Sequence, residues 1–333
     1  MVLKLTPTVR FTTESPALLL RNSPSLTSLT ILLSFQPPAN AFVPKEQIVG
    51  NEEHYPLEMN FCTHCAHLQL SCVIAPEVLF RNYVYVSGTS PVMVQHLKDY
   101  AREAVELVGL EKHDMVFEFG SNDGTLLEQF KNSGFVNVLG MDPARNIAEI
   151  ASARGLQTIP DFFNPESAQK VRKLHGQARL ICANHCCAHI DDLIGVVHGV
   201  KELLASDGIW IFEVGYLLKV LKDSLFDTIY HEHLDFHSLK PIQQFCEAQD
   251  LRLLHASSNS IQGGSLRCFV GWKNSSPTVP GGTASISALI EEEAALGLHS
   301  EATFLRWVRH RILTLLVVYF DSNSVVSSRI SKR

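Results

Sequence analysis

The hydrophobic pattern of the chain alternates short apolar runs with segments of helical periodicity. The apolar run at residues 115–119 ends at a glycine turn, residues 120–124, and a helical pattern follows through residues 126–130. Apolar runs bounded by turn residues predict strands, and apolar residues three and four positions apart predict helices. Further strands are predicted at 138–141, 157–159, 178–183 and 208–214, and helices at 91–110 and 144–154. This alternation predicts an α/β fold, with a mostly parallel sheet wound on both faces.

A ligand site is expected at the turn that follows the first of these strands. In doubly wound sheets, ligands bind beyond the carboxyl ends of the strands, near the switch in strand order. The turn reads Glu118-x-Gly120-x-x-x-Gly124, and Asp142 ends the second strand. Glycine lets the backbone approach a ligand, and the helix that follows begins with free amide groups. Asp142 can accept hydrogen bonds from both hydroxyls of a ribose. The alternative is a tight turn that serves packing alone.

The spacing of the turn distinguishes two kinds of cofactor. A dinucleotide site of the form G-x-G-x-x-G has a third glycine that opens the helix, and this turn lacks it. S-adenosylmethionine has no phosphate and does not need that glycine. We therefore expect S-adenosylmethionine, with a nicotinamide-dependent oxidoreductase as a disfavoured alternative. The residues expected to bind the cofactor are Glu118, Gly120, Asn122, Asp123, Gly124, Asp142, Pro143 and Asn184.

Composition and charge exclude several classes of partner. The 333 residues are 46% hydrophobic and carry a net charge of −6, so the chain can bury a large core and has no basic surplus to follow a phosphate backbone. We expect no nucleic-acid partner. The apolar run at residues 312–320 is about half the length that crosses a bilayer, and we expect no membrane partner. The expected location is cytoplasmic, although the Ser-rich, acid-poor residues 1–40 leave an organelle transit peptide open.

The cysteines indicate a reducing compartment and half of a metal site. The chain has eight cysteines, without the dense spacing of a disulfide framework. Cys62 and Cys65 form its only C-x-x-C, whereas a structural zinc normally has four protein ligands. His64, His67 or Cys72 could complete such a site, in an unusual local cluster. Zinc at Cys62 and Cys65 is therefore left open.

The segment DTIYHEHLDFHS, residues 227–238, is unusually rich in ionisable groups. His231 and His233 could ligate a metal from one face of a strand, but a third ligand is not obvious. A polar surface is the default interpretation of a single histidine, whereas Tyr230 and Phe236 on either side of the cluster indicate partial burial. Ionisable groups are costly to bury without a purpose. The third interpretation is a general base, because a histidine that is neutral at pH 7 can accept a proton.

Three further features have simple expected roles. Cys186 and Cys187 are expected to be small core residues, because no basic partner is adjacent in the sequence. The glycines at 263 and 264 are expected to form a turn before a strand at 266–270. The acidic run at residues 291–293 is expected to be the solvated start of a helix, where the helix dipole favours negative charge.

A series of segments resembles the S-adenosylmethionine-dependent sugar C-methyltransferases, which act on nucleotide-linked keto-deoxysugars. These segments run in the family's order, from about residue 20 to residue 305. They are QPPANAF (36–42), FCTHCAHLQL (61–70), LFRNYVYVSGTS (79–90), FEFGSNDGTLLEQF (117–130), GMDPARNIAEIA (140–151), AHIDDL (188–193), FDTIYHEHLDFHSL (226–239) and GGSLRCFV (263–270).

The resemblance implies a three-part organisation around a Rossmann-like class I methyltransferase domain. Residues 1–90 would form a small irregular module like a zinc-binding module, 91–275 the methyltransferase domain, and 276–333 the start of a truncated C-terminal domain. The family's zinc module has two C-x-x-C pairs, and here the first pair is replaced by residues 20–23, which read LRNS. In the family a C-terminal domain helps to hold the sugar nucleotide, whereas this chain stops at Arg333.

The resemblance also implies roles for the ionisable residues. His233 would be the base that removes a proton next to the ketone, with no metal required. Methyl transfer would follow, in line from S-adenosylmethionine to the enolate. The residues implied in catalysis are His233, Glu232, Tyr230, His189 and Tyr85. Glu232 could hold the sugar or orient an imidazole, and His189 could donate to the carbonyl oxygen.

Two questions stay open at this point. The sequence does not determine the sugar, the carbon that is methylated, or the oligomeric state. An alternative to the enzyme is a catalytically inactive binding or regulatory protein that keeps the methyltransferase scaffold.

Overall fold

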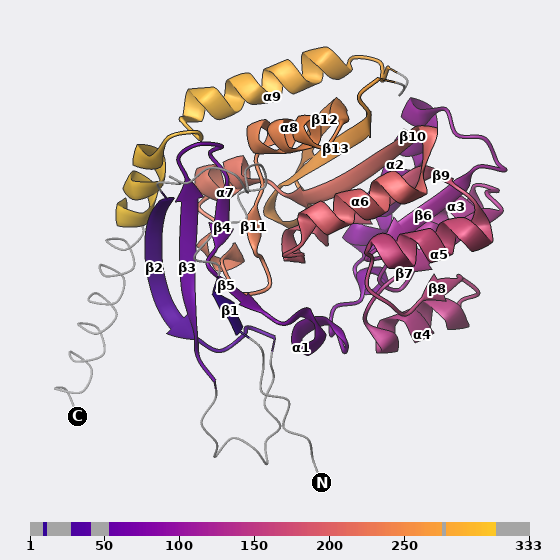
Figure 1. The fold of residues 1–333 in the computed structure, drawn as a ribbon, viewed down its shortest axis with the longest axis horizontal. Coiled ribbons are helices and arrows are strands. Elements are labelled where there is room, and N and C mark those ends of the chain that lie inside the picture. Colours follow the sequence, from indigo (N-terminus) through magenta and orange to yellow (C-terminus); the bar gives the residue numbers. More distant parts are fainter. Residues whose placement is uncertain (1–8, 12–27, 41–52, 275–277, 311–333) are drawn as a thin grey trace, which may run out of the picture.

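The computed structural model describes residues 9–11, 28–40, 53–274 and 278–310, and it is built around a seven-stranded sheet (Figure 1). The strand order is β12-β13-β10-β9-β6-β7-β8. Strands β6 to β10 run parallel to one another. Strands β13 and β12 form an antiparallel hairpin at one edge, where β13 pairs with β10. The strands are β6 (Met115–Phe119), β7 (Asn137–Met141), β8 (Thr158–Ile159), β9 (Ala178–Asn184), β10 (Leu204–Gly215), β12 (Leu251–Asn259) and β13 (Ser265–Trp272).

The predicted doubly wound, Rossmann-like fold is confirmed by this sheet. From β6 the chain adds β7 and β8 on one side and then β9 and β10 on the other, so the strand order reverses between β6 and β9. Every residue of β6 is buried, which is the expected pattern for a central parallel strand covered on both faces. Strand β10 begins at Leu204, earlier than the predicted 208, because Leu204 already pairs with Ala178 of β9. A register irregularity separates this pair from the regular ladder that starts at Ile209.

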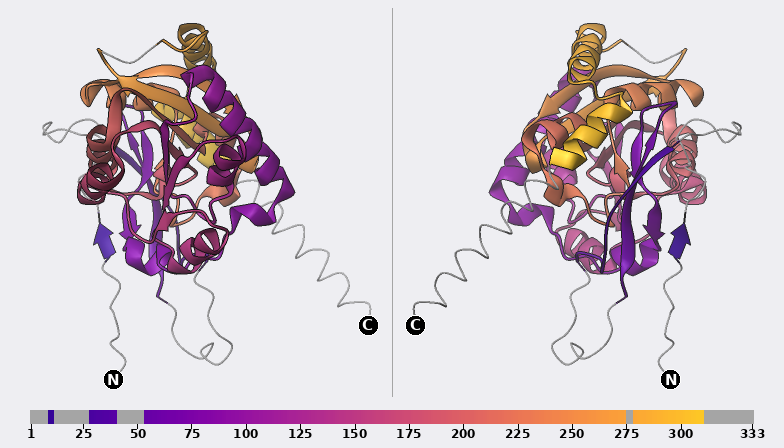
Figure 2. Two further views of the ribbon diagram at one scale, coloured as in Figure 1. Left: turned by 90° about the vertical axis from the view of Figure 1, so that its right-hand side faces the viewer. Right: turned by 90° about the vertical axis from the view of Figure 1, so that its left-hand side faces the viewer.

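Helices cover both faces of the sheet (Figure 2). Side chains of α2 and α3 pack with Val116 and Leu180 on one face, whereas α5 and α6 pack with Phe117 and Ile181 on the other. These strand residues alternate because neighbouring side chains of a strand point to opposite faces. The helices are α2 (Pro91–Val108), α3 (Thr125–Asn132), α4 (Arg145–Ala153), α5 (Pro165–His175), α6 (Leu193–Leu203), α7 (Leu217–Asp223), α8 (Leu239–Ala248) and α9 (Gly282–Leu296).

A second, antiparallel sheet joins the N-terminal residues to the loop that contains the histidine cluster. Its order is β11-β4-β3-β2, and its strands are β2 (Ser28–Gln36), β3 (Tyr55–Cys62), β4 (Leu68–Leu70) and β11 (Asp235–Phe236). Strand β5 (Cys72–Ile74) pairs instead with β1 (Val9–Phe11), and the short helix α1 (Pro76–Phe80) follows it. Because β11 comes from the second predicted domain, this sheet crosses the predicted boundary at residue 90.

The predicted solvated helix start at residues 291–293 is wrong for Glu293. Helix α9 begins earlier, at Gly282, and the Glu293 side chain is fully buried near its end. The carboxylate accepts hydrogen bonds from the hydroxyl of Tyr216 and from the backbone amides of Leu239 and Lys240. Those amides open α8, so the charge is stabilised at the N-terminus of a neighbouring helix and not in solvent.

The remaining expectations concern the cysteines, the late turn and the membrane. All eight cysteines are free thiols, and Cys187 is buried in the core as expected, whereas Cys186 is only partly buried. A turn at residues 263–264 precedes β13, as predicted. Within the described ranges, no helix is both long and apolar enough to cross a membrane.

Candidate active site

A cavity of about 920 Å³ opens at the carboxyl ends of the parallel strands. Its wall includes residues that end or follow β6, β7 and β9, among them Glu118, Asp142 and Asn184. Other parts of the wall come from the N-terminal residues, through Tyr83 and Tyr85, and from the loop that contains Tyr230 and His233. The cavity therefore lies at the predicted switch point and is also lined by two segments far apart in the sequence.

The glycine turn has the backbone shape that only glycine adopts easily. Gly120 and Gly124 have φ angles of +65° and +77°, in the left-handed region. A side chain at Gly120 would also lie 2.7 Å from the Cβ of Cys186, so the turn packs closely against the loop after β9. The amide of Asn122 donates to the carboxylate of Asp142 at 2.8 Å, and this bond joins the ends of β6 and β7.

Two carboxylates at these strand ends are buried beside the cavity. Burial raises the pKa of Glu118 well above its usual range, against the lowering effect of a hydrogen bond from Asn184. The pKa of Asp142 is raised by burial and lowered in part by backbone amides, including that of Ala144 at 2.9 Å. The two Asp142 oxygens each retain a second lone pair for a ligand.

Several buried polar atoms of the wall have no partner within the described part of the chain. These atoms are Oε2 of Glu118, Oγ of Ser121 and Oδ1 of Asn184. Buried polar atoms are nearly always hydrogen-bonded in folded proteins. Hydroxyl or ammonium donors of a bound ligand would satisfy these three acceptors.

Two of the residues predicted to bind the cofactor lie behind the wall. The carboxylate of Asp123 forms an ion pair with Arg154 at 3.0 Å and accepts a hydrogen bond from the amide of Gly88 at 3.2 Å. Gly124 packs against the side chain of Leu156. Neither residue belongs to the cavity wall, whereas the other predicted cofactor residues do: Glu118, Gly120, Asn122, Asp142, Pro143 and Asn184.

His233 is held in one tautomer. Its Nδ1 lies 2.7 Å from the carbonyl oxygen of Thr228, which can only accept, so Nδ1 donates. In the neutral ring Nε2 then has the lone pair, and it accepts the Tyr230 hydroxyl at 3.1 Å. Burial lowers the pKa of His233, which favours the neutral ring.

His189 packs against His233 and is also neutral. The two ring centroids are 5.0 Å apart in an edge-to-face arrangement. Burial, and then the neighbouring His233 and His185, hold the pKa of His189 well below its usual range. A neutral His189 can still donate one N–H into the cavity, but it supplies no positive charge.

Glu232 contacts a tyrosine that the sequence analysis missed. Its carboxylate is buried, and its oxygens accept hydrogen bonds from Tyr83 Oη at 3.1 Å and from Asn40 Nδ2 at 2.6 Å. Burial, and then the Glu232 charge, raise the pKa of Tyr83, so its hydroxyl stays protonated. Tyr85 also reaches the wall, near Gln262. Tyr85 was predicted, and its i, i+2 spacing from Tyr83 is the signal that could have indicated Tyr83 as well.

The described residues provide half of a zinc ligand set. Cys62 and Cys65 are buried, and a hydrogen bond between their thiols lowers the pKa of Cys62 to about 5 and raises that of Cys65. Nowhere in the described ranges do three or more His, Cys, Asp or Glu side chains gather as a metal site. His231 and His233, the other candidate metal ligands, therefore belong to no such group among the described residues. Residues 20–23, which replace the family's first pair, lie outside the described residues.

Comparisons with known proteins give two domain assignments. Residues 93–256 match the family model described as "Methyltransferase domain", and residues 22–80 match the one described as "Putative zinc binding domain". C-methyltransferase NovU from Streptomyces niveus is 40% identical over 233 residues, which are 70% of this chain and 55% of NovU. The chain thus spans about half the length of this curated relative.

Comparison with solved structures finds methyltransferases that match part of the chain at low sequence identity. The magnesium protoporphyrin IX methyltransferase ChlM from Synechocystis with bound SAH has 13% identity and a TM-score of 0.42, over 54% of this chain and 86% of ChlM. An S-adenosylmethionine-dependent methyltransferase from Clostridium acetobutylicum has 15% identity and a TM-score of 0.43, over 54% of this chain and 92% of its own.

Proposed function

Residues 93–256 belong to the methyltransferase-domain family, and on this premise we propose that the protein is an S-adenosylmethionine-dependent C-methyltransferase that acts on a nucleotide-linked keto-deoxysugar. The observation that carries the proposal is one cavity with two kinds of wall. Unpartnered acceptors line it at the strand ends, and a neutral imidazole with a fixed tautomer also lines it. NovU, named as a C-methyltransferase, supports the type of reaction.

The strand-end wall fits the methyl donor. S-adenosylmethionine supplies a methyl group on a positively charged sulfonium and also has an ammonium and two ribose hydroxyls. Glu118, Ser121 and Asn184 offer the acceptors that such donors need, and Asp142 offers its second lone pairs to the ribose. No lysine or arginine occurs among the described residues of the wall, so a cationic ligand meets no like charge there.

His233 is the proposed base. The C–H bond next to the substrate ketone breaks, its proton moves to Nε2 of His233, and its electron pair forms the enolate. The Thr228 carbonyl, bonded to Nδ1, keeps Nε2 facing the reacting carbon and accepts from the imidazolium that forms. The Tyr230 hydroxyl leaves Nε2 and is then free to donate to a substrate oxygen.

Methyl transfer completes the reaction. The enolate carbon forms its bond to the methyl group as the bond from sulfur to that carbon breaks, and the ketone is restored. Orientation of the two reactants can supply roughly 7 to 11 kcal/mol of the acceleration. The N-terminal residues line the same cavity as the strand ends, so both reactants can be held there side by side.

Two measurements test the proposal in sequence. Isothermal titration with S-adenosylhomocysteine is expected to show binding that Asp142→Ala weakens by at least tenfold and that Asp223→Ala, at an exposed aspartate of α7, leaves unchanged. Methyl transfer to a panel of keto-deoxysugars linked to different nucleoside diphosphates, followed by mass spectrometry, is expected to disappear in His233→Ala. His198→Ala, at an exposed histidine of α6, is the matched control.

Each negative result has a distinct meaning. Absence of S-adenosylhomocysteine binding by the wild-type chain would overturn the proposal as a whole. Cofactor binding without methyl transfer to any such sugar would support the alternative of an inactive methyltransferase scaffold. Binding of NAD in the same titration would support the oxidoreductase alternative.

A further inference from the structure

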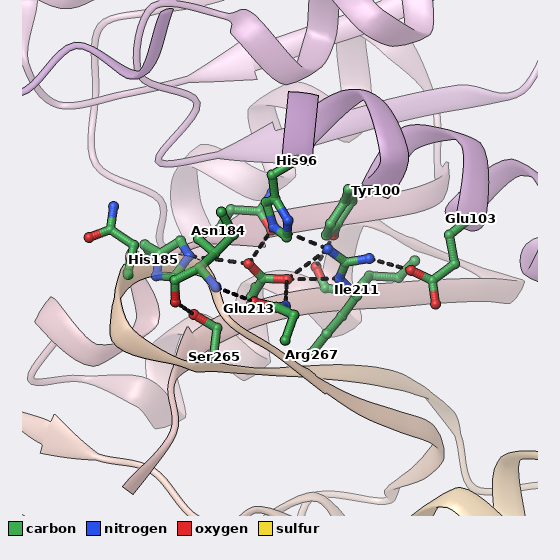
Figure 3. Close-up of polar contacts among 12 residues, drawn as sticks. His96, Tyr100, Glu103, Asn184, His185, Ile211, Glu213, Ser265 and Arg267 are labelled. Carbon is green, nitrogen blue, oxygen red and sulfur yellow. Dashed lines mark hydrogen bonds and ion pairs between the residues drawn. The ribbon is translucent and has the colours of Figure 1, made fainter. Parts of the chain in front are cut away.

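A third histidine of the cavity is held by a buried carboxylate. His185 directly follows β9 and lines the cavity with a side chain that is 21% exposed. Its Nε2 lies 3.2 Å from Oε1 of Glu213, a fully buried residue of β10 (Figure 3). A carboxylate only accepts hydrogen bonds, so Nε2 donates. In the neutral ring the lone pair is then on the second nitrogen, Nδ1, which bonds to none of the described residues.

The Glu213 carboxylate is ionised, and donors occupy both of its oxygens. Burial alone would raise the pKa of Glu213, but hydrogen bonds from His185 and His96 and the charge of Arg267 hold it well below its usual range. Oε1 accepts from His185 and, at 2.7 Å, from His96, whereas Oε2 accepts from Nε of Arg267 at 2.8 Å and from Asn259 at 3.0 Å (Figure 3). Two donors to each oxygen match the lone pairs of a carboxylate. The tautomer of His185 is therefore fixed by residues that lie outside the cavity wall.

The backbone of His185 is held in a conformation that is unusual for this residue type. Its φ of +51° lies in the left-handed region, which few residues other than glycine adopt. Its amide donates to the backbone carbonyl of Glu213 at 2.7 Å, so the same residue anchors both the backbone and the ring. Strain of this kind persists where the surrounding structure enforces it, and it is concentrated at ligand-binding positions. The strain and the fixed tautomer are two separate indications that Nδ1 has a ligand.

The position of His185 favours the sugar as that ligand over the cofactor. In the sheet, β10 with Glu213 and β6 with Glu118 flank β9 on opposite sides, so the ring turns away from the proposed cofactor acceptors. Gly215, at the end of β10, lines the cavity on that side. After burial, a charge on His185 would further lower the pKa of His233, so the two rings lie within electrostatic range. A neutral His185 leaves His233 free to accept a proton and does not repel a sulfonium.

We propose that neutral His185, with its tautomer fixed by Glu213, accepts a hydrogen bond at Nδ1 from a hydroxyl or amino group on a carbon next to the ketone, and so determines which keto-deoxysugar is methylated. This rests on the proposed function. His233 remains the base, and no bond or proton of His185 changes in the reaction. A sugar with only hydrogen at that carbon would leave Nδ1 unpaired, and sites that bond a donor of the substrate discriminate against analogues that lack it. His185 is thus a substrate-binding residue, and Glu213 is a positioning residue.

A matched set of sugars measures this discrimination. Three keto-deoxysugars on the same nucleoside diphosphate would be compared, identical except for a hydroxyl, an amino group or hydrogen on a carbon next to the ketone. The wild type is expected to favour a sugar with a donor over the deoxy sugar by at least about tenfold in kcat/KM, and the better of the two identifies the donor. His185→Leu is expected to lose this preference. His185→Asn, whose amide oxygen can replace Nδ1 as acceptor, is expected to keep part of it. The intrinsic reactivity of each sugar is the same for every variant, so a changed preference measures the hydrogen bond.

Nitrogen NMR of isotope-labelled histidine tests the tautomer directly. The signals that disappear in His185→Leu assign the ring, and a proton is expected on Nε2 with a lone pair on Nδ1. In Glu213→Gln the new amide can donate to Nε2, so the ring is expected to move its proton to Nδ1 and the sugar preference to be lost, as a wrong tautomer is costly even in an intact site. His96→Asn keeps the carboxylate and is expected to keep the tautomer. Titration with S-adenosylhomocysteine, within about threefold of wild type, would confirm that each variant is folded. Glu213→Gln also tests the inference if His185→Leu does not fold.

The outcomes distinguish this inference from the function on which it rests. An equal sugar preference in the wild type and His185→Leu, or no preference in the wild type, would overturn the role of His185 and leave the C-methyltransferase proposal intact. A proton on Nδ1 of wild-type His185, alone or together with one on Nε2, would do the same. Absence of methyl transfer to every nucleotide-linked keto-deoxysugar of the panel, in a wild-type chain that binds S-adenosylhomocysteine, would overturn the proposed function and this inference together.

Discussion

At the scale of single residues, hydrogen bonds assign different states to the cavity histidines. His233 keeps a lone pair on Nε2 because a backbone carbonyl engages Nδ1, whereas His185 faces a carboxylate. Residue type alone therefore did not determine the chemistry of these rings.

The pH dependence of His233 gives the first prediction. Burial lowers the pKa of His233, so the ring becomes protonated only at a pH below the usual histidine value of about 6.5. A protonated ring cannot act as the proposed base. The rate of methyl transfer is expected to stay constant as pH falls through that value and to decline below it. A profile of kcat/KM against pH checks this, and a decline centred above 6.5 would contradict the neutral His233.

The second prediction concerns Gly120. In Gly120→Ala the new Cβ would meet Cys186 at 2.7 Å as well as the strain of a positive φ, and we expect a loss of about 2 kcal/mol in unfolding free energy. Gly109→Ala is the matched control, because its φ is +68° and nothing lies within 4 Å of the added atom. Urea unfolding of both variants measures the clash. Equal losses would show that the loop after β9 yields easily.

At the scale of elements, the strands of the parallel sheet could be predicted and the second sheet could not. Runs such as Met115–Phe119 are buried along their whole length because both faces are covered, and they are apolar apart from Glu118, which makes them visible in the sequence. The pairing of β11 with β4 joins Asp235 to Gln69, and such long-range pairs have no local signal. Glu213 was missed for the same reason, since its partners come from α2, β12 and β13.

The third prediction concerns the contact between α9 and α8. Glu293→Gln keeps the size of the side chain but removes the negative charge that accepts the first amides of α8. We expect a loss of about 1–3 kcal/mol in the free energy of unfolding. Glu291→Gln, at an exposed position of the same helix, is expected to change it by less than about 0.5 kcal/mol. Similar values for the two variants would contradict the capping role.

At the scale of the whole molecule, buried histidines lie where the second sheet meets the methyltransferase domain. His67 forms a 2.6 Å ion pair with Asp235, and the ring of His237 lies 5.8 Å from that of His67. Burial lowers the pKa of His237 to about 4. A histidine with a lowered pKa binds more protons in the unfolded chain than in the folded one, so it removes stability as pH falls from about 6.5 towards 4.

The fourth prediction follows from this linkage. Between pH 7 and pH 5, His237 is expected to remove about 2 kcal/mol of stability from the wild type. Urea unfolding at the two pH values measures the loss, and His237→Gln is expected to lose less by about that amount. A pH dependence that is the same in both proteins would show that His237 does not stay neutral in the folded state.

Strand β11 has a consequence for how this protein can be divided. The loop that supplies His233 ends in a strand that, within the described residues, pairs in the second sheet with β4, from the residues that match the zinc-binding family model. His233, the proposed base, therefore lies in a segment that pairs with residues far upstream of its own domain. A fragment that keeps residues 91–275 alone would retain the sheet and its glycine turn while the segment bearing the base lost its anchor. We expect such a fragment to bind S-adenosylhomocysteine but to have lost the proposed methyl transfer, so that the two modules work only when they are present together.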